Sequence, residues 1–72
     1  MNNRISIGKR IAELRKQKGW SQAELAEKCK MAPGNIARIE TGKYSTGVDL
    51  LGKIADALGF EIDFVPIRII AN

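Results

Sequence analysis

The chain has 72 residues, of which 44% are hydrophobic and 28% charged, and its formal net charge is +4. This length allows one small domain, and the hydrophobic content is too high for a chain that stays disordered. The single cysteine excludes an internal disulfide, and the lack of histidine removes the commonest metal ligand and general base. We therefore expect no metal, no cofactor and no enzymatic activity.

The charge is unevenly distributed along the chain. Residues 1–30 carry a net charge of +5, whereas residues 45–72 carry −2. A basic first half favours a polyanionic partner and predicts a different role for the tail. The sequence shows neither a signal-peptide pattern nor an apolar run of membrane-spanning length, so a cytoplasmic protein without membrane contact is expected.

Two helices are predicted in the first 30 residues. Ile7, Ile11 and Leu14 share one face of a helix over about residues 5–18, which Gly19 ends. The next segment, SQAE, is a capping box that begins at Ser21, and it predicts a second helix over residues 22–29. Cys29 falls in this helix as a small buried apolar group.

The segment KMAPGNIARIETGK combines a turn signal with a helical pattern. Because proline is well tolerated at the first helical position, we predict a third helix that Pro33 opens and Gly42 ends, with Ile36 and Ile39 facing inward. A fourth helix is predicted over residues 48–58. The segment FEIDFV then alternates apolar and acidic residues over 60–65, which is a strand pattern.

The stretch SQAELAEKCKMAPGNIARIETGK resembles the helix-turn-helix core of the Cro/repressor (XRE-type) DNA-binding regulators. The resemblance implies a mainly α fold: a four- or five-helix, lambda-repressor-like domain over residues 1–59. Residues 60–72 form the tail, whose short β-strand, as in HipB-like antitoxins, pairs across a dimer.

The resemblance also assigns roles to single residues. The third helix would read bases in the major groove. Its candidate base-reading residues are Pro33, Gly34, Asn35 and Arg38. Pro33 and Gly34 carry no hydrogen-bonding side chain, so direct reading falls to Arg38 and Asn35; phosphate contact is the alternative for both. The candidate phosphate contacts are Ser21, Gln22, Lys43, Tyr44 and Arg10. Arg15 and Glu40 are assigned to structure, as an interior ion pair between the first and third helices.

The tail is predicted to make a homodimer. A single strand cannot satisfy its own backbone groups, and pairing with the same strand of a second copy would satisfy them. Phe60, Ile62 and Phe64 would then lie at the interface. The alternative is a tail that lies across its own helices.

Three functions are compatible with these patterns. The favoured one is a sequence-specific regulator of transcription that binds double-stranded DNA, most simply a homodimeric repressor. The second is the antitoxin of a toxin–antitoxin pair, which binds operator DNA and a toxin protein. The third is an interaction module that has lost DNA binding, an alternative raised by Pro33 and Gly34.

Overall fold

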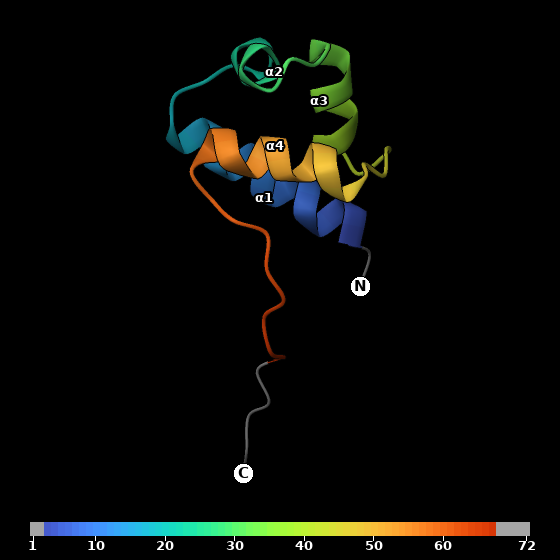
Figure 1. Cartoon of the computed structure of the whole chain (residues 1–72). Helices are drawn as coiled ribbons and strands as arrows, with labels where there is room; N and C mark the ends of the chain where they lie inside the picture. The colour runs from blue at the N-terminus through green and yellow to red at the C-terminus, as the bar shows by residue number, and fades with distance from the viewer. Residues whose placement is uncertain (1–2, 68–72) are drawn as a thin grey trace.

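Four helices account for most of the computed structural model, which describes residues 3–67. They are α1 (Asn3–Gln17), α2 (Gln22–Cys29), α3 (Pro33–Glu40) and α4 (Val48–Leu58). In Figure 1, α1 and α4 cross the lower part of the helical body, while α2 and α3 lie above them. The mainly α, four-helix fold predicted from the sequence is confirmed, and no fifth helix occurs within residues 3–67.

The core lies where the four helices meet. Leu25 of α2, Ile36 of α3 and Ile54 of α4 are completely buried, each at the centre of its apolar stripe. Ile11 and Leu14 add the contribution of α1, with exposed fractions of 5% and 8%. Ile7, which the sequence places on the same face, stays 40% exposed because it lies at the open side between α1 and α4.

α1 and α3 touch through their backbones at Gly8. A Cβ atom at this position would fall on the carbonyl oxygen of Ile39 and lie 2.8 Å from that of Glu40. Only glycine allows the two helices to come this close. Gly8 therefore fixes the distance between α1 and the C-terminal end of α3.

We expect Gly8→Ala to lower the free energy of unfolding by about 1–3 kcal/mol, because the backbone of α3 must move to admit the methyl group. Gly52→Ala in α4 is the matched control, since a Cβ there would have Ile62 Cδ1 at 4.0 Å as its nearest neighbour. The control should be neutral, or stabilising by up to about 1 kcal/mol through helix propensity. Urea denaturation of both variants measures this, and equal behaviour of the two would contradict the close contact.

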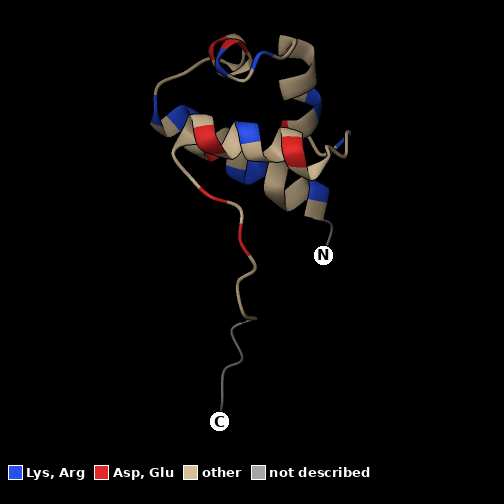
Figure 2. Cartoon of the chain, viewed as in Figure 1, with Lys and Arg blue, Asp and Glu red and all other residues tan. Residues whose placement is uncertain are grey.

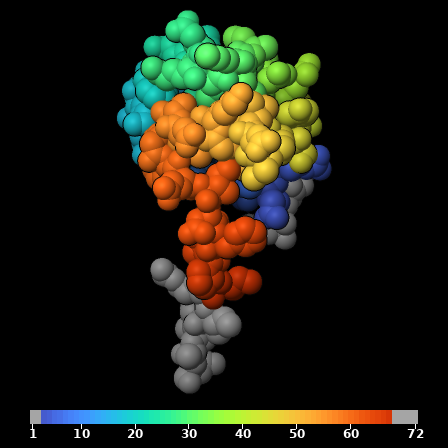
Figure 3. Space-filling view, viewed as in Figure 1, coloured from blue at the N-terminus to red at the C-terminus, as the bar shows by residue number. Residues whose placement is uncertain are grey.

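The tail leaves the helical body after α4. The amide of Phe60 still donates to the carbonyl of Ala55, at 2.8 Å, as the last turn closes. Beyond it the chain leads away from the helices (Figures 1 and 3) and contains no strand up to residue 67. Pairing with a second copy therefore remains a prediction for this segment, and residues 68–72 of the predicted tail lie outside the described residues.

Candidate nucleic-acid interface

The unit of α2, a short turn and α3 has well-defined ends. The Ser21 hydroxyl accepts from the amide of Glu24 at 3.0 Å, and the Glu24 carboxylate accepts from the amide of Ser21 at 2.8 Å. These two bonds form the predicted capping box and hold the pKa of Glu24 below its ordinary value. At the C-terminal end of α2, Lys30 takes a left-handed conformation with φ of 58°, which turns the chain sharply toward α3.

α3 begins at the proline. Ala32 is the N-cap in an extended conformation, and Pro33 occupies the first turn, where its missing N–H costs nothing. Pro33, Gly34 and Arg38 are exposed, and Asn35 is half-buried. A Cβ atom on Gly34 would meet no atom within 4 Å. The first turn of α3 thus presents little more than backbone, with Arg38 as the long side chain one turn further along.

A buried ion pair holds this unit against α1. Arg15 Nε donates to one carboxylate oxygen of Glu40 at 2.7 Å, and its terminal nitrogen donates to the other at 3.0 Å. The third nitrogen of Arg15 donates to the carbonyl of Trp20 at 2.8 Å. The side chains are only 10% and 5% exposed, so the two residues that the family resemblance pairs lie inside the molecule.

Gln22 joins this pair. Its amide nitrogen donates to a carboxylate oxygen of Glu40 at 2.9 Å, which links the start of α2 to the end of α3. We call Arg15, Gln22 and Glu40 the buried network. An amide nitrogen carries two hydrogens, so a second donor remains on Gln22 for a phosphate.

The network sets the charge of Glu40. Burial alone would raise the pKa of this carboxyl, but hydrogen bonds from Arg15 and Gln22, together with the charges of Arg15 and Lys16, hold it below its ordinary value. The hydrogen bond to Glu40 in turn raises the pKa of Arg15 against the effect of burial. Both partners are therefore ionised in the folded protein near neutral pH.

The remaining predicted phosphate contacts fall in two places. Lys43 and Tyr44 are exposed in the segment that follows α3, and the amide of Lys43 donates to the carbonyl of Arg38 at 3.0 Å. Arg10 lies elsewhere. It follows Gly8 by two residues, about 200° around the helix, so it faces away from α3. It pairs with Glu13 at 3.1 Å in an exposed position. The structure does not bring Arg10 together with the other candidates.

Two contacts of this region were not predicted from the sequence, the one at Gly8 and the one between Gln22 and Glu40. Gly8 lies seven residues before Arg15, two helical turns along the same face, and this spacing marks it as part of the surface that meets α3. The bond from Gln22 to Glu40 has no comparable signal, because it joins residues from different helices across 18 positions.

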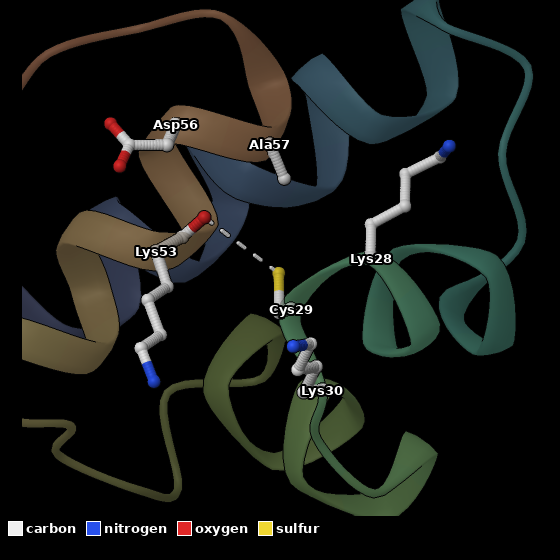
Figure 4. Close-up of a pocket in the computed structure, with 6 residues that line it drawn as sticks. All are labelled: Lys28, Cys29, Lys30, Lys53, Asp56 and Ala57. Atoms are coloured by element: carbon white, nitrogen blue, oxygen red, sulfur yellow. Dashed lines mark hydrogen bonds between the residues drawn. The ribbon is translucent and has the colours of Figure 1, made fainter.

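The cavity around the cysteine does not form a second ionic site. Cys29, Lys28, Lys30 and Lys53 line it with Asp56 and Ala57 (Figure 4). The lysine side chains of residues 28 and 53 point to opposite sides of the thiol, and Lys28 instead lies 4.6 Å above the ring of Trp20. Burial raises the pKa of the Cys29 thiol, which keeps it protonated and unreactive.

Within the described part of the chain, no cluster of three or more acidic or cysteine side chains could hold a metal ion. None of the helices there is long and apolar enough to cross a membrane.

Comparison with known proteins agrees with this geometry. A family model described as helix-turn-helix matches residues 11–65. The immunity repressor of Bacillus phage phi105 is 31% identical over 61 residues, which cover 85% of this chain and 42% of that protein. The chain spans about two fifths of the length of the first curated relatives it matches.

Two solved structures share the fold. The crystal structure of the biofilm master regulator SinR in complex with DNA has a TM-score of 0.72 and 36% identity, and covers 76% of this chain and 89% of that one. A chain of the HipA–HipB–O2–O3 complex has a TM-score of 0.79 at 22% identity, over 94% of this chain and 96% of its own length. The second likeness concerns the fold alone. With its capping box, its proline-opened α3 and the family match over residues 11–65, the chain belongs to the helix-turn-helix family of XRE type.

Proposed function

We propose that the chain is a sequence-specific regulator of transcription that binds double-stranded DNA as a homodimeric repressor, with α3 in the major groove. The observation that carries this proposal is the exposed face of α3, held in place by the buried network. Pro33, Gly34 and Arg38 are exposed on a helix whose other end is tied to α1 and α2 through Glu40. A rigidly oriented helix with one uncovered face suits insertion into a groove about 12 Å wide.

The roles within this interface follow from chemistry. Arg38 can donate two hydrogen bonds to a guanine edge, and the half-buried Asn35 can reach adenine or a phosphate. Pro33 can pack on a thymine methyl, while Gly34 lets the backbone approach the bases. Gln22, Ser21, Lys43 and Tyr44 would hold the DNA backbone, helped by the partial positive charge at the start of α2. We leave Arg10 out of the proposed interface, because it lines the pocket between α1, α4 and the tail.

Dimerisation is part of the proposal. One recognition helix reads only a few base pairs, and two held about 34 Å apart would read successive major grooves on one side of the DNA. The tail supplies the apolar surface for such a dimer, with Phe64 97% exposed. Its acidic stretch directly after α4, seen in Figure 2, would stay away from the phosphates.

The test begins with selection of bound sequences from a random DNA pool. On the selected site, Arg38→Ala should cost about 1–3 kcal/mol of binding free energy and much less on random DNA, because base contacts are lost. Lys43→Ala is the matched control, since loss of a phosphate contact weakens binding to both DNAs alike. If Arg38→Ala weakens both DNAs equally, Arg38 is a phosphate contact and base reading comes from other residues. If no sequence is enriched, the proposal is wrong.

The antitoxin function is the second candidate. The fold likeness to a chain of the HipA–HipB–O2–O3 complex, over nearly the full length of both chains, is what favours it. Co-purification of this chain with a toxin encoded beside it, and loss of toxicity on co-expression, would support this function. If the product of the neighbouring gene neither co-purifies with this chain nor is toxic, the antitoxin function is excluded and the repressor function stands.

A further inference from the structure

The N-terminal half of α1 carries the end of α3 and the residues that follow it. Ile5 and Gly8 lie three positions apart, so they share one face of α1. Gly8 meets the last carbonyl groups of α3, as described above. Ile5 meets Gly42, because a Cβ atom on Gly42 would lie 2.7 Å from Cγ1 of Ile5 and 3.0 Å from its Cα. In Figure 1 the segment between α3 and α4 accordingly lies beside this end of α1.

Glycine is needed at position 42 for two independent reasons. The φ of Gly42 is +75°, in the left-handed region where a side chain is strained. Gly42 also lies against the backbone of Ile5, so a side chain there would push the following residues away from α1. Gly19 separates the two reasons. Its φ is almost the same, +74°, but a Cβ atom on it would meet no atom within 4 Å. The two glycines therefore share the strain and differ in the contact.

Lys43 and Tyr44 follow Gly42 directly. The amide of Lys43 donates to the carbonyl of Arg38 at 3.0 Å, which ties the first of them to α3. Tyr44 is 45% exposed and lines a pocket together with residues of α1, α3 and α4. A tyrosine side chain has only two χ angles, so the place of its hydroxyl follows the place of its backbone. A shift of Gly42 away from α1 would therefore move the Tyr44 hydroxyl and the base of the Lys43 side chain.

We propose that Ile5 and Gly42 are positioning residues for DNA binding, and that their contact holds Lys43 and Tyr44 where both reach the DNA backbone while α3 lies in the major groove. The inference rests on the function proposed above and adds to it two residues that do not touch DNA. Phosphate contacts carry no sequence information. Loss of the contact between Ile5 and Gly42 should therefore weaken binding to every DNA sequence alike and leave the sequence preference of α3 unchanged.

A double-mutant cycle tests this role. Gly42→Ala should lower the affinity for the selected duplex and for random DNA about tenfold each, because hydrogen bonds to charged phosphates are lost. In a chain that already carries Lys43→Ala and Tyr44→Phe, Gly42→Ala should have no further effect, since the groups it displaces are gone. Gly19→Ala is the matched control for strain and should keep the affinity of the wild type. Circular dichroism confirms that each variant is folded.

The partner residue gives a second measurement. Ile5→Ala in the same chain as Gly42→Ala should recover part of the lost affinity, because it removes the atom nearest to the new methyl group. Ile5→Ala alone alters a side chain that is 43% exposed and can be measured even if Gly42→Ala unfolds the chain. It should weaken binding to both DNAs by a smaller factor, and this loss too should vanish in the chain with Lys43→Ala and Tyr44→Phe.

The outcomes separate this role from DNA binding itself. If the wild type binds DNA and the variants at positions 5 and 42 bind it equally well, the positioning role is wrong and the proposed function stands. The role is also wrong if Gly42→Ala weakens binding as much without the Lys43 amine and the Tyr44 hydroxyl as with them. An equal loss in Gly19→Ala would assign the effect to backbone strain and overturn the role of the contact. A wild type that binds no DNA overturns the proposed function, and the positioning role with it.

Discussion

Glu40→Ala should lower the free energy of unfolding by about 3–5 kcal/mol, which is a large share of the stability of a small domain. The substitution leaves the guanidinium of Arg15, whose side chain is only 10% exposed, without its carboxylate partner. It also removes the acceptor for Gln22, and with it the link between α2 and α3. Chemical denaturation followed by circular dichroism measures the loss.

Glu13→Ala is the matched control for this prediction. It too removes a glutamate that pairs with an arginine, but both side chains of that pair are about 60% exposed. An exposed pair of this kind contributes about 0.3–0.5 kcal/mol. If the two substitutions have similar effects on unfolding, the ion pair between Arg15 and Glu40 is open to solvent and does not fix the helices.

The ion pair between Arg15 and Glu40 also makes the free energy of unfolding depend on pH. Because the pKa of Glu40 is lowered in the folded protein, the unfolded chain binds the proton more readily. The stabilisation of the folded state by ionised Glu40 is fully present above the ordinary glutamate pKa. It is lost as the pH falls through the lower pKa that Glu40 has in the folded protein. The difference in unfolding free energy between the wild type and Glu40→Gln should therefore narrow on acidification.

DNA affinity should fall steeply with salt. If a subunit pair neutralises about six phosphates, affinity should drop on the order of 10³-fold between 50 and 200 mM salt, because bound counterions are released from the duplex. A logarithmic plot of affinity against salt concentration should then have a slope of about −5. Fluorescence anisotropy with a labelled duplex gives this slope.

Lys43→Ala sharpens the salt experiment. Loss of one phosphate contact per subunit should make the slope of log affinity against log salt concentration less negative by about 2 for the dimer. Circular dichroism at each salt concentration confirms that the protein stays folded. Affinity that does not change with salt, or no complex at low salt, would indicate instead the interaction module without DNA binding.

Local signals were sufficient to predict the helices. α2 and α4 have the bounds predicted for them, residues 22–29 and 48–58, and the capping box at Ser21 marks the start of α2 as expected. The prediction that Pro33 opens a helix is confirmed, because the missing N–H of proline matters only in the interior of a helix. α1 differs only at its ends, beginning at Asn3 and finishing at Gln17.

Contacts between helices were harder to predict. The sequence shows that Arg10 is charged, but not which way its side chain points. That depends on which face of α1 packs against α3, and Gly8 sets this face. Gln22 reads as a polar residue in a first turn, and only the approach of α3 brings Glu40 within 2.9 Å of it. Such contacts depend on packing angles that no short segment encodes.

The bare first turn of α3 makes this protein suitable for redesign. Position 34 is surrounded by empty space, and a side chain added there would meet no atom of the protein within 4 Å. A glutamine or arginine at this position would extend from the start of α3 without disturbing the core around Ile36. Under the proposed role of α3 in base reading, sequence preference and stability could therefore be varied separately by single substitutions at this position.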